Sequence, residues 1–476
     1  MSNEITKLAP QRVWQHFYEM TQIPHPSKKE EKMTVFAADF GKKLGLYTDV
    51  DKMGNVLIRK PATKGMENRK GVILQGHLDM VMVPQTHTAA IDAYIDGDWV
   101  RARGTTLGAD NGIGSAAAMA ILESTDIPHP QIEALFTVDE ETGMTGAAAI
   151  APNWLKGDIL INLDSEEVDE LCIGCAGGLD AMFADTYTEQ QAQGNAYELT
   201  ISGLKSGHSG MEIVAGRANA IKLSARVLKR LTEKFGVQLA SLKAGEVRNA
   251  IPCKALAVVV CGNNVDAVKS EIAQLQEAIQ NEYKLVEGNI SIDLKPTSAV
   301  QKVVEMSAQK RYIYALLACP NDVIRMSNAI PGLVETSTNL ALVSIADGKF
   351  SAHCLLRSSI ASAITYLSET MESVLKLAGI TCSFTGGYPG WNPNINSPIL
   401  KLMSELYEKM FNKKPNVRAV HAGLECGLLG NKYPNWDMIS CGPNILNPHS
   451  TAERVQISSV ERWWNYLLEV LKSIPA

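Results

Sequence analysis

The chain has 476 residues, 46% of them apolar, and a net charge of −6. This length exceeds what a single hydrophobic core usually serves, so we expect two domains. The ordinary globular composition, the slightly acidic balance and the lack of any run of about 18 apolar residues argue against a nucleic-acid-binding surface and against a membrane span.

The first predicted elements are a helix and several short strands. Ser27-Lys28-Lys29-Glu30 matches a capping box, in which the Ser and Glu side chains bond the backbone at a helix start, and predicts a helix that ends near Leu44. Residues 51–55 have the composition of a turn between two strands. A glycine-punctuated loop at 104–112 leads into an alanine-rich helix. Apolar runs bounded by polar residues predict buried strands within the segments 71–79, 135–141 and 159–164.

The middle of the chain has a different character. The chain changes character near residues 184–195, and the polar residues 186–195 predict a connector. From Tyr197 onward, strands alternate with amphipathic helices, which we place at 218–235, 265–282 and 359–377. A glycine-rich stretch at 386–391 precedes the last two predicted helices, at 399–411 and 458–474.

These elements predict one domain inserted into another. The host is an α/β catalytic domain, with a mixed, mainly parallel sheet between helices, formed by residues 1–188 and 385–476. The insertion, residues 189–384, is an α+β domain without a dense cluster of metal ligands. Domain termini often lie close together, which makes such an insertion common.

Five residues suited to binding metal accompany the host elements. In open α/β sheets, ligands gather at the carboxyl ends of strands, and zinc takes imidazole and carboxylate ligands. His77 and Asp164 each end an apolar run, and we expect them to bind one zinc ion. Glu141 ends another run and His449 follows the run 438–441, and we expect these two to bind a second ion. Asp110, just before the alanine-rich helix, would bridge the two ions, for which Co²⁺ or Mn²⁺ could substitute.

Two further carboxylates accompany these ligands. Asp79 comes two residues after His77, so it falls on the same face of a strand end and can accept the second ring N–H. Glu140 precedes Glu141, and adjacent side chains diverge at a strand end, which leaves Glu140 to take the proton from an attacking water. Alone, a His-x-Asp or a Glu-Glu pair is usually a solvent-exposed polar segment without a function. The hypothesis of a two-metal hydrolytic site therefore rests on the whole set.

Longer motifs around these residues resemble those of a known family. They are Gly76–Val81, Gly104–Gly114, Asp139–Gly143, Asn162–Glu167, Gly207–Gly210, Arg248–Pro252 and Gly442–Ser450. As a set they make the chain similar, over nearly its whole length, to the dizinc metallopeptidases that include carnosinase, peptidase T, peptidase V and aminoacylase. The resemblance implies a cis peptide bond after Asp110. It also implies hydrolysis of unblocked dipeptides, with Xaa-His dipeptides preferred, by a metal-activated water and Glu140 as general base.

The resemblance gives roles to residues outside the metal cluster. It makes the inserted domain a lid whose His208 donates to the oxyanion, and it places Asn249 at the substrate. Glu425 corresponds to a position that binds a substrate ammonium, and Arg357 is a candidate clamp for the substrate carboxylate. Ordinary alternatives are a turn histidine at His208, a solvated loop carboxylate at Glu425 and a lid-surface arginine at Arg357.

Two departures from the family pattern affect these expectations. The loop at 80–87 is more apolar than expected, so substrate entry would differ. The lid looks longer than that of the simplest relatives, which are dimeric. Its two strand–helix sets would then stand in for a partner's lid, so that His208 need not act across subunits. Formation of a homodimer stays a possibility.

The cysteines indicate where the protein is located, and three alternative functions have to be weighed against a dipeptidase. The chain has nine cysteines, an odd number, which favours reduced thiols and a cytoplasmic location. Small dipeptides are the expected partners, with no nucleic acid and no membrane. An inactive binding protein on the same scaffold is an alternative of a different class, but no ligand and no base is missing. A broader di- or tripeptidase and an amidohydrolase of N-acyl amino acids are further alternatives, and Glu425 argues against the last because an acyl group brings no ammonium.

Overall fold

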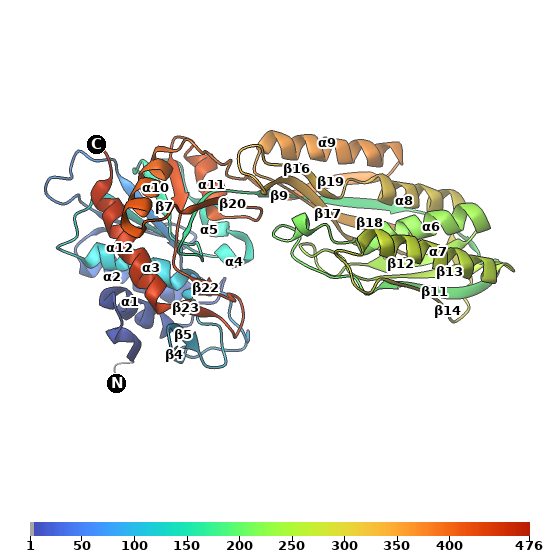
Figure 1. Ribbon diagram of the computed structural model, residues 1–476, viewed down its shortest axis with the longest axis horizontal. Helices are drawn as coiled ribbons and strands as arrows, with labels where there is room; N and C mark the ends of the chain where they lie inside the picture. Colours follow the sequence, from blue (N-terminus) through green and yellow to red (C-terminus); the bar gives the residue numbers. More distant parts are fainter. Residues whose placement is uncertain (1–3) are drawn as a thin grey trace. The chain divides into compact units, whose positions relative to one another are not determined.

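A computed structural model describes residues 4–476, which fold into two compact units (Figure 1). The first unit contains the chain up to Gly174 together with residues 391–419 and 424–476. The second unit contains residues 175–390 and the short segment 420–423. No helix among residues 4–476 is both long enough and apolar enough to cross a membrane.

The boundaries of the units differ from the predicted ones, which were 188/189 and 384/385. The chain enters the second unit earlier, at Cys175, and leaves it later, after Gly390. The reason is the strand β9 (Gly177–Thr186), which pairs with β18 (Lys349–Ser358) and β19 (Thr381–Tyr388) of the second unit. The predicted connector at 186–195 is also partly wrong, because it contains the last residue of β9 and the strand β10 (Glu189–Gln191).

The first unit is built on an eight-stranded mixed sheet. Its strands are β1 (Tyr47–Val50), β2 (Val56–Lys60), β3 (Val72–His77), β6 (Ile132–Thr137), β7 (Ile159–Asn162), β8 (Glu170–Cys175), β20 (Asn416–Val420) and β21 (Asp437–Ser440). The strand order is β1-β2-β6-β3-β7-β21-β8-β20. The central strands β6, β3, β7 and β21 run parallel, while the pairs β1–β2, β2–β6 and β21–β8 are antiparallel. The mixed α/β architecture expected from the sequence is confirmed, with its parallel strands at the centre.

Helices and a small second sheet complete the first unit. The helices are η1 (Glu4–Lys7), α1 (Gln11–Thr21), α2 (Glu31–Lys43), α3 (Ala109–Glu123), α4 (Glu140–Gly143), α5 (Thr145–Ala149), α10 (Pro398–Phe411), α11 (Glu425–Lys432) and α12 (Ile457–Ser473). The small sheet joins β4 (Ala93–Asp96), β5 (Trp99–Ala102), β22 (Ile445–Leu446) and β23 (Arg454–Gln456). Helix α3 packs against β3, β6 and α1, and nearly all of its residues are buried. Its small alanine side chains let these elements approach closely.

The predicted capping box at Ser27–Glu30 is wrong. Helix α2 begins at Glu31, and its N-cap residue Glu30 makes no side-chain cap bond. Ser27 Oγ donates instead to Asp79 Oδ2 over 2.8 Å, and Glu30 Oε1 accepts from the amides of Lys28 and Asp139. These two side chains therefore bond to the segments around Asp79 and Asp139 rather than to the start of a helix.

The second unit is built on a nine-stranded sheet covered by helices. Besides β9, β18 and β19, its strands are β11 (Asn195–Ser202), β12 (Gln238–Ala244), β13 (Ala255–Cys261), β14 (Ser291–Pro296), β16 (Asp322–Met326) and β17 (Val334–Ala346). A separate pair joins β10 to β15 (Lys302–Val304). The helices are η2 (Ile213–Ala215), α6 (Ala220–Phe235), α7 (Val265–Tyr283), α8 (Met306–Ala318) and α9 (Ala361–Leu377). Strands and helices share a large apolar core. On β9, for example, Ala181 and Phe183 are buried in this core while Met182, on the opposite face, is 40% exposed.

The large sheet of the second unit contains one arrangement twice. The chain β11-α6-β12-β13-α7-β14 gives the strand order β14-β11-β13-β12, and β9, α8, β17, β18, α9 and β19 give the order β17-β18-β9-β19. If the four strands of a copy are numbered in chain order, their spatial order in both copies is 2-3-1-4. The edge strands β12 and β17 pair antiparallel and join the copies into one sheet. The two strand–helix sets expected from the sequence are thus nested, because the first copy is inserted between β9 and α8 of the other.

Asn219 links the two copies at the start of α6. Its Oδ1 accepts from the amides of Ile221 and Lys222 and caps the helix. Its Nδ2 donates to the carbonyl of Leu340 on β17 over 2.9 Å. Asn219 is buried, so both sets of bonds are shielded from water.

Asn219→Ala should destabilise the second unit by about 2–3 kcal/mol, because a helix cap and a buried hydrogen bond are both lost. All seven tryptophans lie in the first unit, so tryptophan fluorescence reports that unit while far-UV circular dichroism reports both. In urea denaturation the transition seen by circular dichroism should move to lower urea. Glu305→Ala, which removes a surface cap from α8, is the control and should cost about 1 kcal/mol. An unchanged midpoint in both signals would contradict this role of Asn219.

Candidate metal centre

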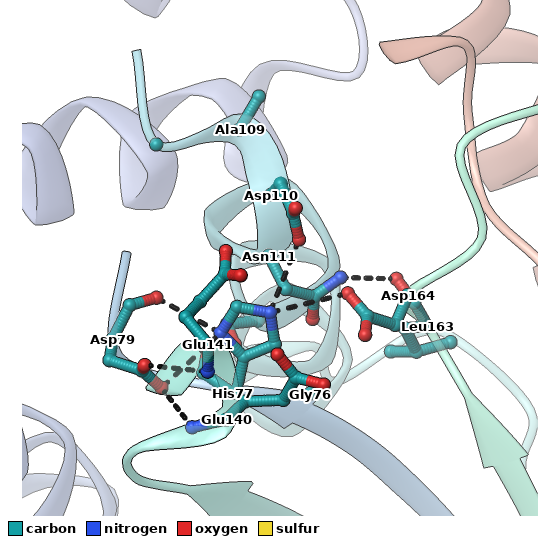
Figure 2. Close-up of polar contacts among 12 residues, drawn as sticks. Gly76, His77, Asp79, Ala109, Asp110, Asn111, Glu140, Glu141, Leu163 and Asp164 are labelled. Carbon is teal, nitrogen blue, oxygen red and sulfur yellow. Dashed lines mark hydrogen bonds and ion pairs between the residues drawn. The ribbon is translucent and has the colours of Figure 1, made fainter. Parts of the chain in front are cut away.

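The expected metal ligands follow strands or begin helices of the first unit. His77 is the last residue of β3, and Asp164 lies just after β7. Asp110 lies at the start of α3, and its peptide bond to the next residue is cis, as the resemblance implies. Glu141 lies in α4, directly after β6, and His449 follows β22. Figure 2 shows Asp110, Glu141 and Asp164 gathered around the imidazole of His77.

Asp110 faces both histidines with different oxygen atoms. Its Oδ1 lies 3.2 Å from Nε2 of His77, and its Oδ2 lies 3.1 Å from Nε2 of His449. Asp164 Oδ1 lies 3.4 Å from the same nitrogen of His77, and Glu141 Oε1 lies 2.9 Å from that of His449. Two groups of possible ligand atoms therefore share Asp110. This grouping matches the assignment made from the sequence, and the binding of ions by it stays a prediction.

Two buried oxygen atoms in these groups fit a cation better than a hydrogen bond. Within residues 4–476, the buried oxygens Glu141 Oε1 and Asp164 Oδ1 accept no hydrogen bond of good geometry, and each has only an imidazole nitrogen at ion-pair distance. An unpaired carboxylate oxygen away from water is unfavourable unless a positive charge faces it. Two ligand atoms that each lie about 2.0–2.2 Å from one tetrahedral zinc ion are about 3.4 Å apart, close to the separations observed here. The residues thus fit two divalent cations, one on each side of Asp110.

The carboxylates hold protons on both imidazoles. Burial lowers the pKa of His77, but Asp164, Asp110 and Asp79 together raise it well above its usual value. The hydrogen bond to Asp110 and the ion pair with Glu141 raise the pKa of His449 to about 11. A histidine must lose its proton to bind a metal through that nitrogen, so a cation has to compete with these protons.

Asp79 organises the turn that carries both glutamates. Its Oδ1 accepts from the amide of Glu140 over 2.9 Å, and its Oδ2 accepts from the amide of Glu141 over 3.2 Å (Figure 2). Burial raises its pKa, but these bonds and His77 outweigh that effect and lower the pKa to about 2. The Nδ1 of His77 lies 2.9 Å from the backbone oxygen of Asp79 and 3.5 Å from its carboxylate. The backbone carbonyl, rather than the expected carboxylate, is therefore the nearer acceptor for this ring.

Glu140 and Glu141 both reach the cluster. The expectation that they diverge at a strand end is wrong, because both lie on α4 and both group with His77. Glu141, but not Glu140, also belongs to the described group with Asp110 and His449. Burial and the nearby carboxylates raise the pKa of Glu140 well above its usual value. A carboxyl group with a raised pKa can take up and return a proton near neutral pH.

Glu425 is a deeply buried carboxylate, and one of its oxygens has no hydrogen-bond partner among the described residues. It is only 2% exposed, so the interpretation as a solvated loop residue is wrong. Its Oε2 accepts from Gln75 Nε2 over 2.6 Å and from Thr137 Oγ1 over 2.7 Å, whereas Oε1 has no partner within residues 4–476. Asn162 in turn donates to Gln75 Oε1 over 2.6 Å, which fixes the orientation of the amide. Burial raises the pKa of Glu425 to about 7.

The other predicted site residues belong to the second unit, where His208 and Arg357 approach each other across Gly210. A Cβ atom on Gly210 would lie 3.1 Å from the ring of His208 and 3.2 Å from Nε of Arg357. Arg357 is 5% exposed, which makes the interpretation as a surface arginine wrong. Its Nη1 donates to the hydroxyl of Tyr388 over 3.4 Å, and its Nε is buried without a partner among the described residues. Asn249 is exposed, and its backbone oxygen accepts from the amide of Ser209.

His208 has a defined tautomer. Its Nδ1 accepts from the amides of Gly210 and Met211 over 3.2 and 3.0 Å, so Nε2 carries the proton of the neutral ring. Burial and the nearby charge of Arg357 lower the pKa of His208, which keeps the ring neutral at physiological pH. His208 is therefore a neutral donor through Nε2.

Several buried polar groups of both units were not expected from the sequence. Gln75 interrupts an apolar strand, a signal that was visible in the sequence. Glu453 follows His449 in a loop and is nevertheless 3% exposed. His421 is buried, bonds Ser337 Oγ through Nε2 over 2.7 Å, and has its pKa lowered to about 3 by burial and by Arg357. No local sequence signal distinguishes Glu453 or His421 from ordinary loop residues.

Comparisons with known proteins extend over most of the chain. The family described as peptidase family M20/M25/M40 matches residues 73–473. A cytosol non-specific dipeptidase of Escherichia coli (strain K12) is 44% identical over 484 residues, which cover 100% of both chains. The crystal structure of an aminoacylhistidine dipeptidase from Vibrio alginolyticus is 42% identical, covers 99% of this chain and 98% of that one, and has a TM-score of 0.93. A tripeptidase from Staphylococcus aureus, 16% identical with a TM-score of 0.56 over 98% of this chain and 99% of its own, shares the fold.

His449→Ala should lose one of the two expected ions, whereas Glu140→Gln should keep both, because only the first change removes a member of the group around Asp110 and Glu141. The apparent affinity of the unsubstituted protein should rise with pH through the neutral range, since the raised pKa values of His77 and His449 make protons compete with the cation. Elemental analysis and calorimetric titration with Zn²⁺ at several pH values measure both effects. One ion or none in the saturated protein, or an affinity that falls with rising pH, would refute the arrangement.

Proposed function

The chain belongs to peptidase family M20/M25/M40, an enzyme family of peptide hydrolases, and we propose that it is a two-metal dipeptidase acting on unblocked dipeptides, with Xaa-His dipeptides preferred. The observation that carries the proposal is Asp110, which offers one carboxylate oxygen to each histidine of the cluster. The names of the E. coli and V. alginolyticus relatives support a dipeptide substrate, and the second supports histidine in it. The word cytosol in the first name supports a cytoplasmic location.

Proton transfer is the task that we propose for Glu140. Two divalent cations, if bound around Asp110, would lower the pKa of a water molecule and polarise the substrate carbonyl; zinc is the proposed metal. Glu140 then takes the proton from the attacking water on its carboxylate and returns it to the nitrogen of the leaving amine. Asp79 keeps Glu140 in place through the backbone amides of the turn. Nε2 of His208 is proposed to donate to the oxygen that becomes negative in the transition state.

The two ends of the substrate are proposed to be recognised by buried charges. Oε1 of Glu425, buried and without a partner among the described residues, would accept from the ammonium group. Arg357, also buried, would donate from its unpartnered Nε to the carboxylate. Asn249 stays a proposed substrate contact that rests on its motif.

Two other functions of the same site remain as alternatives. The E. coli relative is named a non-specific dipeptidase, which favours a broader choice of side chains than Xaa-His. An amidohydrolase of N-acyl amino acids is disfavoured by Glu425, because an acyl group would leave Oε1 without a cation.

Glu140→Gln should lower kcat by about 10²–10⁴-fold, or roughly 3–5 kcal/mol of barrier, because the amide has no basic oxygen for the proton. Metal content and the circular dichroism spectrum should not change. The exposed Glu167, three positions after Asp164, offers a control, and Glu167→Gln should leave kcat unaltered. Steady-state kinetics with a free dipeptide measures the effect. A Glu140→Gln protein with near-normal turnover would exclude this base.

A substrate panel tests the proposed specificity. Values of kcat/KM for a free Xaa-His dipeptide should exceed those for other free dipeptides. N-acetylation or extension by a third residue at the carboxyl end should each lower kcat/KM by about 10²-fold or more, because each leaves a buried charged group unpaired. Glu425→Gln should narrow the difference in kcat/KM between the free and the N-acetylated dipeptide. It should leave unchanged the loss in kcat/KM that a third residue at the carboxyl end causes. Similar values for all substrates would favour a general peptidase or an acylase.

A further inference from the structure

Glu453 is a buried carboxylate that is neither one of the expected metal ligands nor the proposed base. It lies at the end of the loop between β22 and β23, which also carries His449. Its backbone amide donates to the carbonyl of Ser450, so the loop closes on itself as a turn. A carboxylate that is 3% exposed must have strong hydrogen-bond donors around it.

The donors are four consecutive backbone amides at the start of α3. Oε2 accepts from Leu107 over 2.7 Å and from Gly108 over 3.0 Å. Oε1 accepts from Ala109 over 2.8 Å and from Asp110 over 3.3 Å. Gly108, with φ at 75°, lies in the left-handed region that a residue with a side chain rarely adopts. Asp110 and Asn111 have non-helical backbone angles, so the four amides lie ahead of the regular part of α3, and the Glu453 carboxylate is the acceptor that they share.

The contact between Glu453 and these amides joins two loops of the expected metal centre. One loop supplies Asp110 itself, and the other supplies His449, whose Nε2 lies 3.1 Å from Asp110 Oδ2. A bridging carboxylate has to present one oxygen to each side, so a small rotation of its backbone would withdraw one of them. The amide of Asp110 is held directly by Glu453, and the three preceding amides are held by the same carboxylate.

We propose that Glu453 is a positioning residue that fixes the backbone of Asp110 so that its carboxylate can bridge two cations. The inference rests on the part of the proposed function that concerns two metal ions, and it does not depend on which peptide is cleaved. Its consequence is measured as metal affinity in the absence of substrate. Residues that orient a metal ligand typically contribute 10–100-fold to metal affinity.

Glu133 is the matched control, since it is also a buried carboxylate that holds a loop of the first unit. It accepts from the amides of Lys156 and Gly157 over 2.6 and 2.8 Å, and from Arg59 Nε over 2.6 Å. None of these partners is a proposed metal ligand. Removal of Glu133 therefore tests what the loss of a loop contact does by itself.

The experiment titrates Zn²⁺ into the full-length metal-free protein and its variants by calorimetry, with elemental analysis of the saturated samples. Glu453→Ala should lower the affinity for at least one ion by about 10–100-fold. Glu453→Gln should behave similarly, because its amide group would turn a donor toward backbone donors. Glu453→Asp, which keeps both acceptors on a shorter side chain, should recover part of the affinity. Glu133→Ala should lower the urea midpoint and leave the affinity unchanged.

Added acetate provides a second readout that a general loss of stability would not produce. In Glu453→Ala the four amides still point at the space that the carboxylate filled, so acetate should restore zinc affinity as its concentration rises. Acetate should have no such effect on the unsubstituted protein or on Glu133→Ala.

Several outcomes would overturn the proposal. Unchanged zinc affinity in Glu453→Ala excludes the positioning role, and an equal loss in Glu133→Ala assigns the effect to stability. If the unsubstituted protein binds a single ion, the two-metal function fails. In that case the zinc affinities of the Glu453 variants are compared for the single ion. An unchanged affinity in Glu453→Ala then rejects the positioning role of Glu453 as well.

Discussion

The negative charge buried around Asp110 is the constraint on which the site depends. Asp110, Glu141 and Asp164 converge at the carboxyl edge of parallel strands, and such a concentration of carboxylates is stable only if positive charge faces it. In the protein alone that charge comes from protons on His77 and His449. The same arrangement that favours protons on those imidazoles would favour divalent cations at the proposed site, because a cation supplies the charge at a shorter distance.

Backbone amides, rather than lysines or arginines, hold the carboxylates that surround the cluster. Asp79 binds the amides of Glu140 and Glu141, and Glu453 binds those that lead into Asp110. Amides donate strong hydrogen bonds but carry no net charge, so they fix the direction of a carboxylate without neutralising the centre. An arginine at the same place would compete with the cations for the ligand oxygens. This division keeps the cluster negative and ordered at the same time.

In the second unit the buried charge is positive, and Arg357 carries it. Arg357 is buried beside His208, and burial lowers the pKa of its guanidinium. His208 and His421 stay neutral next to this cation, since protonation would place like charges side by side. A buried guanidinium with an unpartnered Nε suits a carboxylate brought by a ligand. The nested duplication of the sheet places His208 in one copy and Arg357 in the other, so both residues come from a single chain.

Local patterns in the sequence determined the central strands, the long helices and the expected metal ligands. An apolar run that ends in His77 or Asp164 can be recognised locally as a strand, whereas the hypothesis of a metal site needed all the motifs together. Other features depend on pairings between distant segments. The structure shows that β9 belongs to the second unit, that Ser27 bonds Asp79 instead of capping a helix, and that Glu425 is buried against Gln75. Glu453 resembles any loop glutamate until folding brings the amides of residues 107–110 to its carboxylate. Burial and the partner of a polar group are properties of the tertiary structure, because they are set by residues that lie far away along the chain, 52 positions for Ser27 and Asp79 and 350 for Gln75 and Glu425.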